Sequence, residues 1–131
     1  MRQRIAYYLR ADPGQAYSLN FQKALLDRFV ARYGQLSKGS VELYCDCCDS
    51  FSNLGPEHER LTQDVKDGKI DVVIVADIGR ICRCALELEA FLNLMELRHF
   101  RFISAGDHLD INGWPELQQC RADFKAETKA S

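Results

Sequence analysis

No stretch of this 131-residue sequence approaches the roughly 20 consecutive apolar residues that a membrane-spanning helix requires. The start, MRQRIAYYLRAD, carries charges where a secretory signal has its apolar segment. An excess of basic residues is also absent, since 17 Lys and Arg stand against 19 Asp and Glu, a formal net charge of -2. We therefore expect a cytoplasmic protein with no membrane partner. Any contact with nucleic acid must use a local basic patch.

The sequence contains no internal repeat and no low-complexity tract. Its 47% hydrophobic residues are enough to form one core, so we expect a single domain over residues 1–131. Short apolar or branched runs predict four buried strands, over residues 5–9, 41–44, 70–76 and 100–103. Helical spacing between these runs predicts three helices: one capped by Ser18 and ending near Gly34, one beginning at Pro56 and ending before Gly68, and one over residues 85–97.

The alternation of strands and helices predicts an α/β fold, with a four-stranded, mainly parallel sheet and helices on both faces. Ligands bind such sheets beyond the carboxyl ends of the strands. After the fourth strand, residues 116–129 predict a last, mostly polar helix. Its narrow apolar stripe of Leu117, Cys120 and Phe124, together with Trp114, favours packing against a second copy of the chain, so we expect a homodimer.

Arginines cluster beyond the first and third predicted strands. Arg10 precedes Asp12 in the first group, and Arg80 and Arg83 form the second. Two interpretations remain open from spacing alone. Each arginine can pair with a surface carboxylate, which is common in proteins, or the three can form a site for a phosphate or a phosphoryl transition state.

Several short motifs occur in an order that resembles one family. They are Tyr8-Leu9-Arg10-Ala11-Asp12, Ser18-Leu19-Asn20-Phe21-Gln22, Tyr44-Cys45-Asp46 with Ser50, and Gly68 to Val75 running into Asp77-Ile78-Gly79-Arg80-Ile81-Cys82-Arg83. From Ile5 to about Asp110 the chain resembles the N-terminal catalytic domain of the serine recombinases, the resolvases and invertases. The resemblance implies a resolvase-like fold and site-specific DNA recombination.

In that family a serine attacks the DNA backbone and forms a covalent phosphoserine link, and arginines stabilise the charge without a metal or another cofactor. The resemblance implies that Arg10, Arg80 and Arg83 are active-site and phosphate-binding arginines and that Gln22 helps to build the pocket. Asp12 stands at the position of the nucleophilic serine. We therefore list Arg10, Asp12, Gln22, Arg80 and Arg83 as the candidate catalytic site.

Asp12 departs from the family because a carboxylate is a poorer nucleophile than an alkoxide and its acyl phosphate is prone to hydrolysis. We expect the three arginines to converge near Asp12, which would occupy ground that a phosphate needs. Gly55 is a second departure, because the family usually carries another phosphate-binding arginine there. Both departures predict a degenerate domain that binds DNA, weakly in the absence of the family's separate DNA-binding domain, but does not cleave it.

Two alternatives remain open. In the first, the domain is an active strand-transfer enzyme whose nucleophile is Asp12 or a nearby serine, Ser18 or Ser50. In the second, it is a metal-binding or redox-responsive interaction module, because the clusters Cys45, Cys47, Cys48 and Cys82, Cys84 follow the second and third strands. Their spacing does not match structural zinc sites, so we expect reduced thiols and no metal.

Overall fold

The computed structural model describes residues 3–47, 55–82, 84–106 and 109–110. In chain order the elements are β1 (Arg4–Ala11), α1 (Tyr17–Arg32), α2 (Gly34–Ser37), β2 (Ser40–Cys47), α3 (Pro56–Lys66), β3 (Val72–Val75), the 3-10 helix η1 (Ile78–Arg80), α4 (Ala85–Arg98), β4 (Arg101–Ser104) and β5 (Leu109–Asp110). Within the described residues, none of the helices combines the length and the apolarity needed to cross a bilayer.

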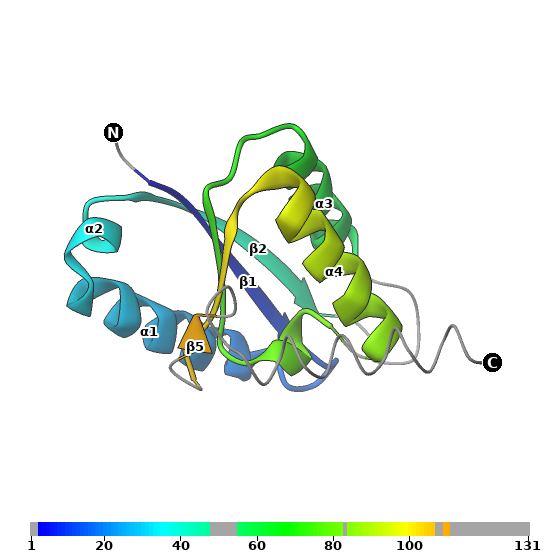
Figure 1. The fold of residues 1–131 in the computed structure, drawn as a ribbon. Helices are drawn as coiled ribbons and strands as arrows, with labels where there is room; N and C mark the ends of the chain where they lie inside the picture. The colour runs from blue at the N-terminus through cyan, green and yellow to red at the C-terminus, as the bar shows by residue number, and fades with distance from the viewer. Residues whose placement is uncertain (1–2, 48–54, 83, 107–108, 111–131) are drawn as a thin grey trace.

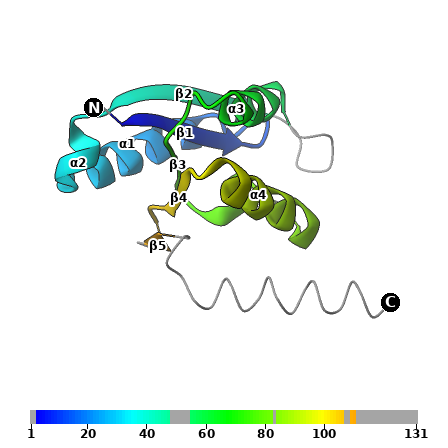
Figure 2. The ribbon, with the colours of Figure 1, turned by 45° about the horizontal axis from the view of Figure 1, so that its top comes forward.

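The strands form one sheet in the order β2-β1-β3-β4-β5, which can be followed from top to bottom in Figure 2. The four predicted strands are all present and run parallel to one another. β1 and β3 are neighbours with Tyr8 opposite Val75, as the apolar runs predict. The sheet ends on β5, a two-residue antiparallel strand that the sequence did not predict.

Helices cover both faces of the sheet, so the predicted fold class is confirmed (Figure 1). On one face, Leu26, Phe29 and Val30 of α1 pack on alternate residues of β1, β3 and β4. On the other face, α3 and α4 pack on the intervening residues, with Leu61 and Val65 of α3 buried in this core. Successive side chains along each strand point to opposite faces of the sheet, and both faces are covered by helices. Every position of a strand is therefore buried, which explains why the strands are continuous apolar runs in the sequence.

The predicted start of α1 is wrong, whereas its end falls close to Gly34 as predicted. Ala16, not Ser18, is the N-cap of α1, and Ser18 lies inside the first turn, where its hydroxyl accepts a hydrogen bond from Gln22. α1 ends at Arg32 and Gly34 begins the short helix α2 instead of closing α1. The predicted α3 is confirmed, with Pro56 in its first turn and Gly68 after it at φ +73. The predicted helix over residues 116–129 lies outside the described residues.

Candidate functional site

The carboxyl edge of the sheet brings the first and third strands of the prediction together. β1 carries Arg10 near its end, and η1 follows β3 and carries Arg80. The Arg80 Nη1 atom donates to the backbone oxygen of Arg10 over 3.3 Å. Two of the three predicted arginines therefore meet at this edge, whereas Arg83 lies outside the described residues.

Arg10 is a buried cation that has no counterion among the residues that the structure describes. Its exposed fraction is 2%, and its Nε, Nη1 and Nη2 atoms have no hydrogen-bond partner among the described residues. An unpaired buried charge is destabilising by several kcal/mol unless an anion neutralises it. Surface pairing, the first of the two interpretations of the arginines, does not apply to Arg10. It does apply to Arg80, whose Nε lies 3.4 Å from an oxygen of Asp77 at the surface.

Gln22 fixes the backbone of Arg10 from helix α1. The Arg10 N–H donates to the Gln22 Oε1 atom over 3.1 Å, and the Gln22 Nε2 atom donates to the Arg10 carbonyl over 2.7 Å. The same Nε2 atom donates to the Ser18 hydroxyl over 2.9 Å. Gln22 is buried, so this clamp is shielded from water. Gln22 thus orders the segment that carries Arg10 but leaves the guanidinium free.

Asp12 lies at the start of a tight turn just beyond β1. The Gln15 N–H donates to the Asp12 carbonyl over 2.9 Å, with Pro13 and Gly14 at the two central positions and Gly14 at φ +86. Proline followed by a glycine with positive φ is the sequence of a type II turn. The Asp12 side chain is exposed and forms no ion pair with a described residue, Arg10 and Arg80 included. The expected ion pairs of Asp12 with these two arginines are therefore not formed.

Asp46 is a buried acidic residue that the sequence analysis did not single out. It lies opposite Arg10 in the β1–β2 register, at the end of β2, and its exposed fraction is 3%. Its carboxylate accepts three hydrogen bonds, from the Tyr8 hydroxyl over 2.7 Å, from the Glu57 N–H over 3.1 Å and from the His58 N–H over 2.9 Å. Asp46 therefore caps the N-terminus of α3 from a neighbouring strand and fixes Tyr8 as well.

Gly55 leaves room for this carboxylate. A Cβ atom added at Gly55 would overlap the side chain of Asp46. The backbone of Gly55 has φ -68 and ψ 166, which any residue can adopt, so the need for glycine arises from the contact alone. The absence of an arginine at position 55 follows physically from the place that Asp46 occupies.

Tyr8 and His58 complete the buried polar cluster. Burial, and then the hydrogen bond to Asp46, raise the pKa of Tyr8 well above its usual range, although the charge of Arg10 opposes this shift. Burial lowers the pKa of His58, against the opposing effects of the Ile81 carbonyl and of Glu87. The His58 Nε2 atom lies 3.1 Å from the Ile81 carbonyl oxygen and donates to it. Both rings are therefore neutral at neutral pH.

The serines and cysteines bear on the alternative interpretations. The Ser18 hydroxyl is bonded to Gln22, and Ser50 lies outside the described residues. Cys45 and Cys47 lie beside Leu9 and Ala11 on the face of the sheet that α1 covers, whereas Cys82 belongs to the core of the opposite face. Within the described part of the chain no three His, Cys, Asp or Glu side chains are grouped to hold a metal ion. The sheet therefore separates Cys45 and Cys47 from Cys82.

These features define a doubly wound α/β domain with two arginines at its carboxyl edge. The chain belongs to the resolvase family: the model of the resolvase N-terminal domain matches residues 5–126. It is a resolvase-family catalytic domain of the kind found in site-specific recombinases. No curated protein matches the chain at a significant level.

Solved structures of recombinase domains share the fold. A resolvase-family site-specific recombinase from Streptococcus pneumoniae superimposes with a TM-score of 0.78 at 20% identity, over 98% of this chain and 89% of that one. The N-terminal catalytic domain of TP901-1 integrase gives a TM-score of 0.75 at 21% identity, over 97% and 95%. The C-terminal catalytic domain of ISC1926 TnpA, an IS607-like serine recombinase, gives 0.65 at 20%, over 76% and 67%.

Proposed function

We propose that this domain binds a DNA phosphate at Arg10 and Arg80 in the cytoplasm and does not cleave the strand. The observation that carries the proposal is the buried guanidinium of Arg10 at the carboxyl edge of the sheet, which no described residue pairs or hydrogen-bonds. A phosphate would supply the missing negative charge and accept the hydrogen bonds that Arg10 does not make. Arg80 is half-exposed beside it and is held by an exposed pair with Asp77 and a long hydrogen bond to the Arg10 carbonyl, so its guanidinium can turn toward the same phosphate.

Inactivity follows from the chemistry of Asp12. The resemblance to the serine recombinases assigns the attacking hydroxyl to this position, and a carboxylate there adds negative charge where a DNA phosphate would approach. Ser18 is committed to Gln22 and lies on a helix instead of the strand end. The clamp of Gln22 on Arg10 supports phosphate binding, which does not need a nucleophile.

Replacing Arg10 by methionine tests the phosphate site. Because the charge is unpaired, R10M should leave the free energy of unfolding unchanged or raise it. The affinity for a short fluorescein-labelled DNA duplex at low salt should fall by at least about tenfold. R98M, at an exposed arginine of α4, is the matched control and should change neither quantity. A destabilised R10M protein with unchanged DNA affinity would mean that Arg10 is structural.

A second experiment tests cleavage. The natural protein and D12S are incubated with supercoiled DNA bearing candidate recombination sites, and protein attached covalently to nicked or broken strands is measured. We expect no adduct from the natural protein. D12S should bind DNA more tightly, with a gain that weakens as salt rises because the change removes one charge. An adduct formed through Asp12 would establish the alternative function, an active strand-transfer enzyme.

A further inference from the structure

Helix α1 presents an exposed face that the core does not use and that is both aromatic and basic. Tyr17, Phe21, Leu25, Arg28 and Arg32 recur at spacings of three or four residues, so they share one side of the helix. Tyr17 is 62% exposed, Phe21 73% and Leu25 37%. Burying rings of this size is strongly favourable, so two largely exposed aromatics one turn apart indicate a binding surface.

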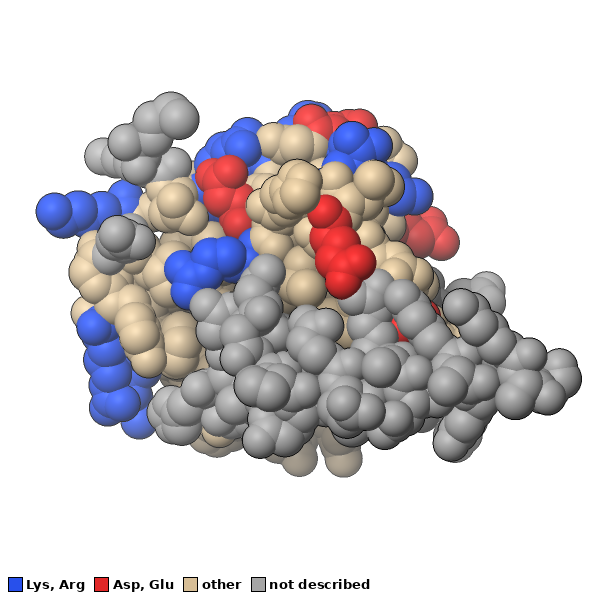
Figure 3. Space-filling model, viewed as in Figure 1, with Lys and Arg blue, Asp and Glu red and all other residues tan. Residues whose placement is uncertain are grey.

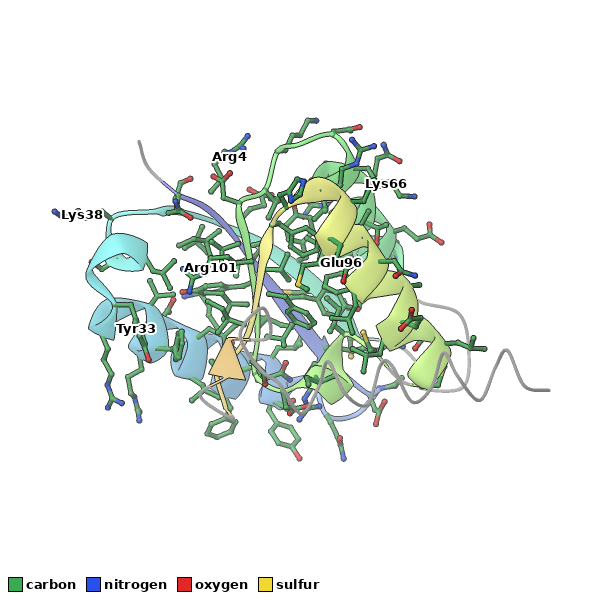
Figure 4. The ribbon with its side chains drawn as sticks, viewed as in Figure 1. Arg4, Tyr33, Lys38, Lys66, Glu96 and Arg101 are labelled. Atoms are coloured by element: carbon green, nitrogen blue, oxygen red, sulfur yellow. The ribbon has the colours of Figure 1, made fainter. Side chains whose placement is uncertain are left out.

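The charged residues of this face, Arg28 and Arg32, are both basic. Arg28 and Arg32 are exposed, and neither forms an ion pair with a described residue. Asp27, the acidic residue beside them, is already bonded to Lys23 over 2.8 Å and to the Tyr7 hydroxyl over 3.0 Å. Figure 3 shows basic side chains over the C-terminal part of α1, at the lower left. Figure 4 shows Lys38 extending outward from the end of α2, the short helix that follows α1. The face therefore fits an anionic partner.

The aromatic residues of the face lie at the N-terminal end of α1, the end of the helix that contacts the Arg10 backbone from its buried side. Tyr17 and Phe21 are the sequence neighbours of Ser18 and Gln22, and Gln22 bonds directly to the backbone of Arg10. From Tyr17 to Arg32 the helix rises roughly 22 Å at about 1.5 Å per residue. An extended strand that lies along this face can therefore contact the two rings and the two arginines at once.

We infer that this face of α1 binds an unpaired strand of DNA, with Tyr17 and Phe21 stacking on its bases and Arg28 and Arg32 on its phosphates. Single strands expose both the flat base surfaces and the charge that this combination of side chains recognises, whereas a duplex hides the base surfaces inside the stack. The inference rests on the proposed function for its choice of DNA. It adds a specificity for unpaired nucleotides that phosphate binding at Arg10 does not require.

The test measures binding of a fluorescein-labelled oligothymidylate to the full chain by fluorescence anisotropy. Y17A/F21A should weaken binding by at least about tenfold, since each lost stacking contact corresponds to at least about a fivefold change. L86A/L97A is the matched control. It removes side chains of α4 that are 68% and 70% exposed, and it should leave the affinity within about twofold.

Two further variants separate stacking from charge. F21W keeps an aromatic ring and should retain the affinity. Its new tryptophan should be quenched when the oligonucleotide binds, so the loss of fluorescence should exceed that of the natural protein, whose one tryptophan is Trp114. If Y17A/F21A does not fold, the quenching of F21W still shows whether position 21 contacts the oligonucleotide. R28Q/R32Q should reduce the slope of log affinity against log salt by about 1.4, from about 0.7 for each lost contact to a single strand, whereas Y17A/F21A should leave that slope unchanged.

Unchanged oligothymidylate binding by Y17A/F21A would overturn the inference. If Y17A/F21A keeps its affinity but changes its sedimentation coefficient, the inference is also wrong. That result would show that this face of α1 contacts a second copy of the chain. R10M distinguishes the two proposals. If R10M binds the duplex normally while Y17A/F21A loses the oligothymidylate, the phosphate site is wrong and the α1 face stands; the reverse pattern removes the α1 face alone.

Discussion

Arg10 lies two residues beyond the end of the ladder between β1 and β3. The last pair in that ladder is Tyr8 with Val75, so the next backbone groups along β1 need another partner. Gln22 supplies it, because its amide donates to the Arg10 carbonyl and accepts from the Arg10 N–H as a strand would. A single side chain therefore continues the sheet by one residue and fixes the position from which the guanidinium extends.

Removing this clamp should destabilise the domain. Q22A leaves the buried N–H of Arg10 without a partner and its carbonyl with only the longer bond from Arg80, so we expect a loss of about 1–3 kcal/mol in the free energy of unfolding. Urea denaturation measures the change. Q63A removes an exposed glutamine that bonds only to Asp67 and should stay within about 0.5 kcal/mol of the natural protein. Equal stability of both variants would show that water replaces the Gln22 amide.

The sequence places the site residues on the right elements but does not predict their surroundings. The positions of Arg10, Asp12 and Arg80 at the carboxyl edge follow from the alternation of strands and helices. The burial of Arg10 does not, because arginine is mostly exposed in proteins and burial depends on contacts between distant segments. Asp46 carried one signal, its place at the end of a strand before a helix that begins with proline, but its role depends on a register that only the folded sheet sets.

At the scale of elements, the start of α3 depends on the pair formed by Asp46 and Gly55. D46A removes the acceptor of two helix N–H groups and of the Tyr8 hydroxyl, and it should reduce the free energy of unfolding by about 2–4 kcal/mol. G55A should also destabilise, because its Cβ meets the Asp46 carboxylate.

In D46A/G55A the overlap no longer exists, so the combined loss should be smaller than the sum of the single losses by at least about 1 kcal/mol. Thermal or urea unfolding of the four proteins measures this coupling. If the losses of unfolding free energy in the two single variants add up to the loss in D46A/G55A, α3 moves to accommodate the methyl group. Asp46 would then not hold α3 in place.

His58, in the first turn of α3, should make the stability of the domain depend on pH. Burial lowers its pKa in the folded protein, so the unfolded chain binds the proton more tightly. Its stabilising contribution is complete above the unfolded pKa of about 6.5 and is lost as the pH falls toward the lowered folded pKa. The natural protein should therefore lose more stability than H58Q between about pH 7.5 and pH 5, as measured by urea unfolding.

H99N is the control for that experiment. His99 ends α4 at φ 56, a conformation that asparagine also adopts, and it lies at the surface. The pH profile of H99N should follow that of the natural protein. A profile of H58Q that also follows it would show that the proton on His58 does not affect folding.

The strands were easier to predict than the ends of the helices. Continuous apolar runs mark strands buried on both faces, and all four such runs are strands. β5 has two residues and no periodicity of its own, because it forms only by pairing with β4. Serine is a common N-cap residue, but the turn that follows Asp12 lets the helix begin before Ser18. The Ser18 hydroxyl therefore accepts a hydrogen bond from Gln22 and does not cap the helix.

At the scale of the whole molecule, the remaining question is self-association. Trp114, Leu117, Cys120 and Phe124 lie outside the described residues, and their spacing predicts an apolar stripe on one side of a helix. We propose that this stripe forms a homodimer. Sedimentation equilibrium should show a dimer that L117E/F124E converts to a monomer, whereas the exposed-leucine variant L86A should remain dimeric. A monomeric natural protein at high concentration would remove this proposal.

The contact between Gly55 and Asp46 also constrains which substitutions this domain can accept in evolution. A lineage in which a larger residue replaces Gly55 must also replace Asp46, because any side chain at position 55 meets that carboxylate. The replacement of Asp46 alone leaves Tyr8 and the start of α3 without their acceptor. Each single step therefore passes through a less stable protein. A larger residue at position 55 therefore requires changes at two coupled positions, and the first change lowers the stability of the domain whichever of the two comes first.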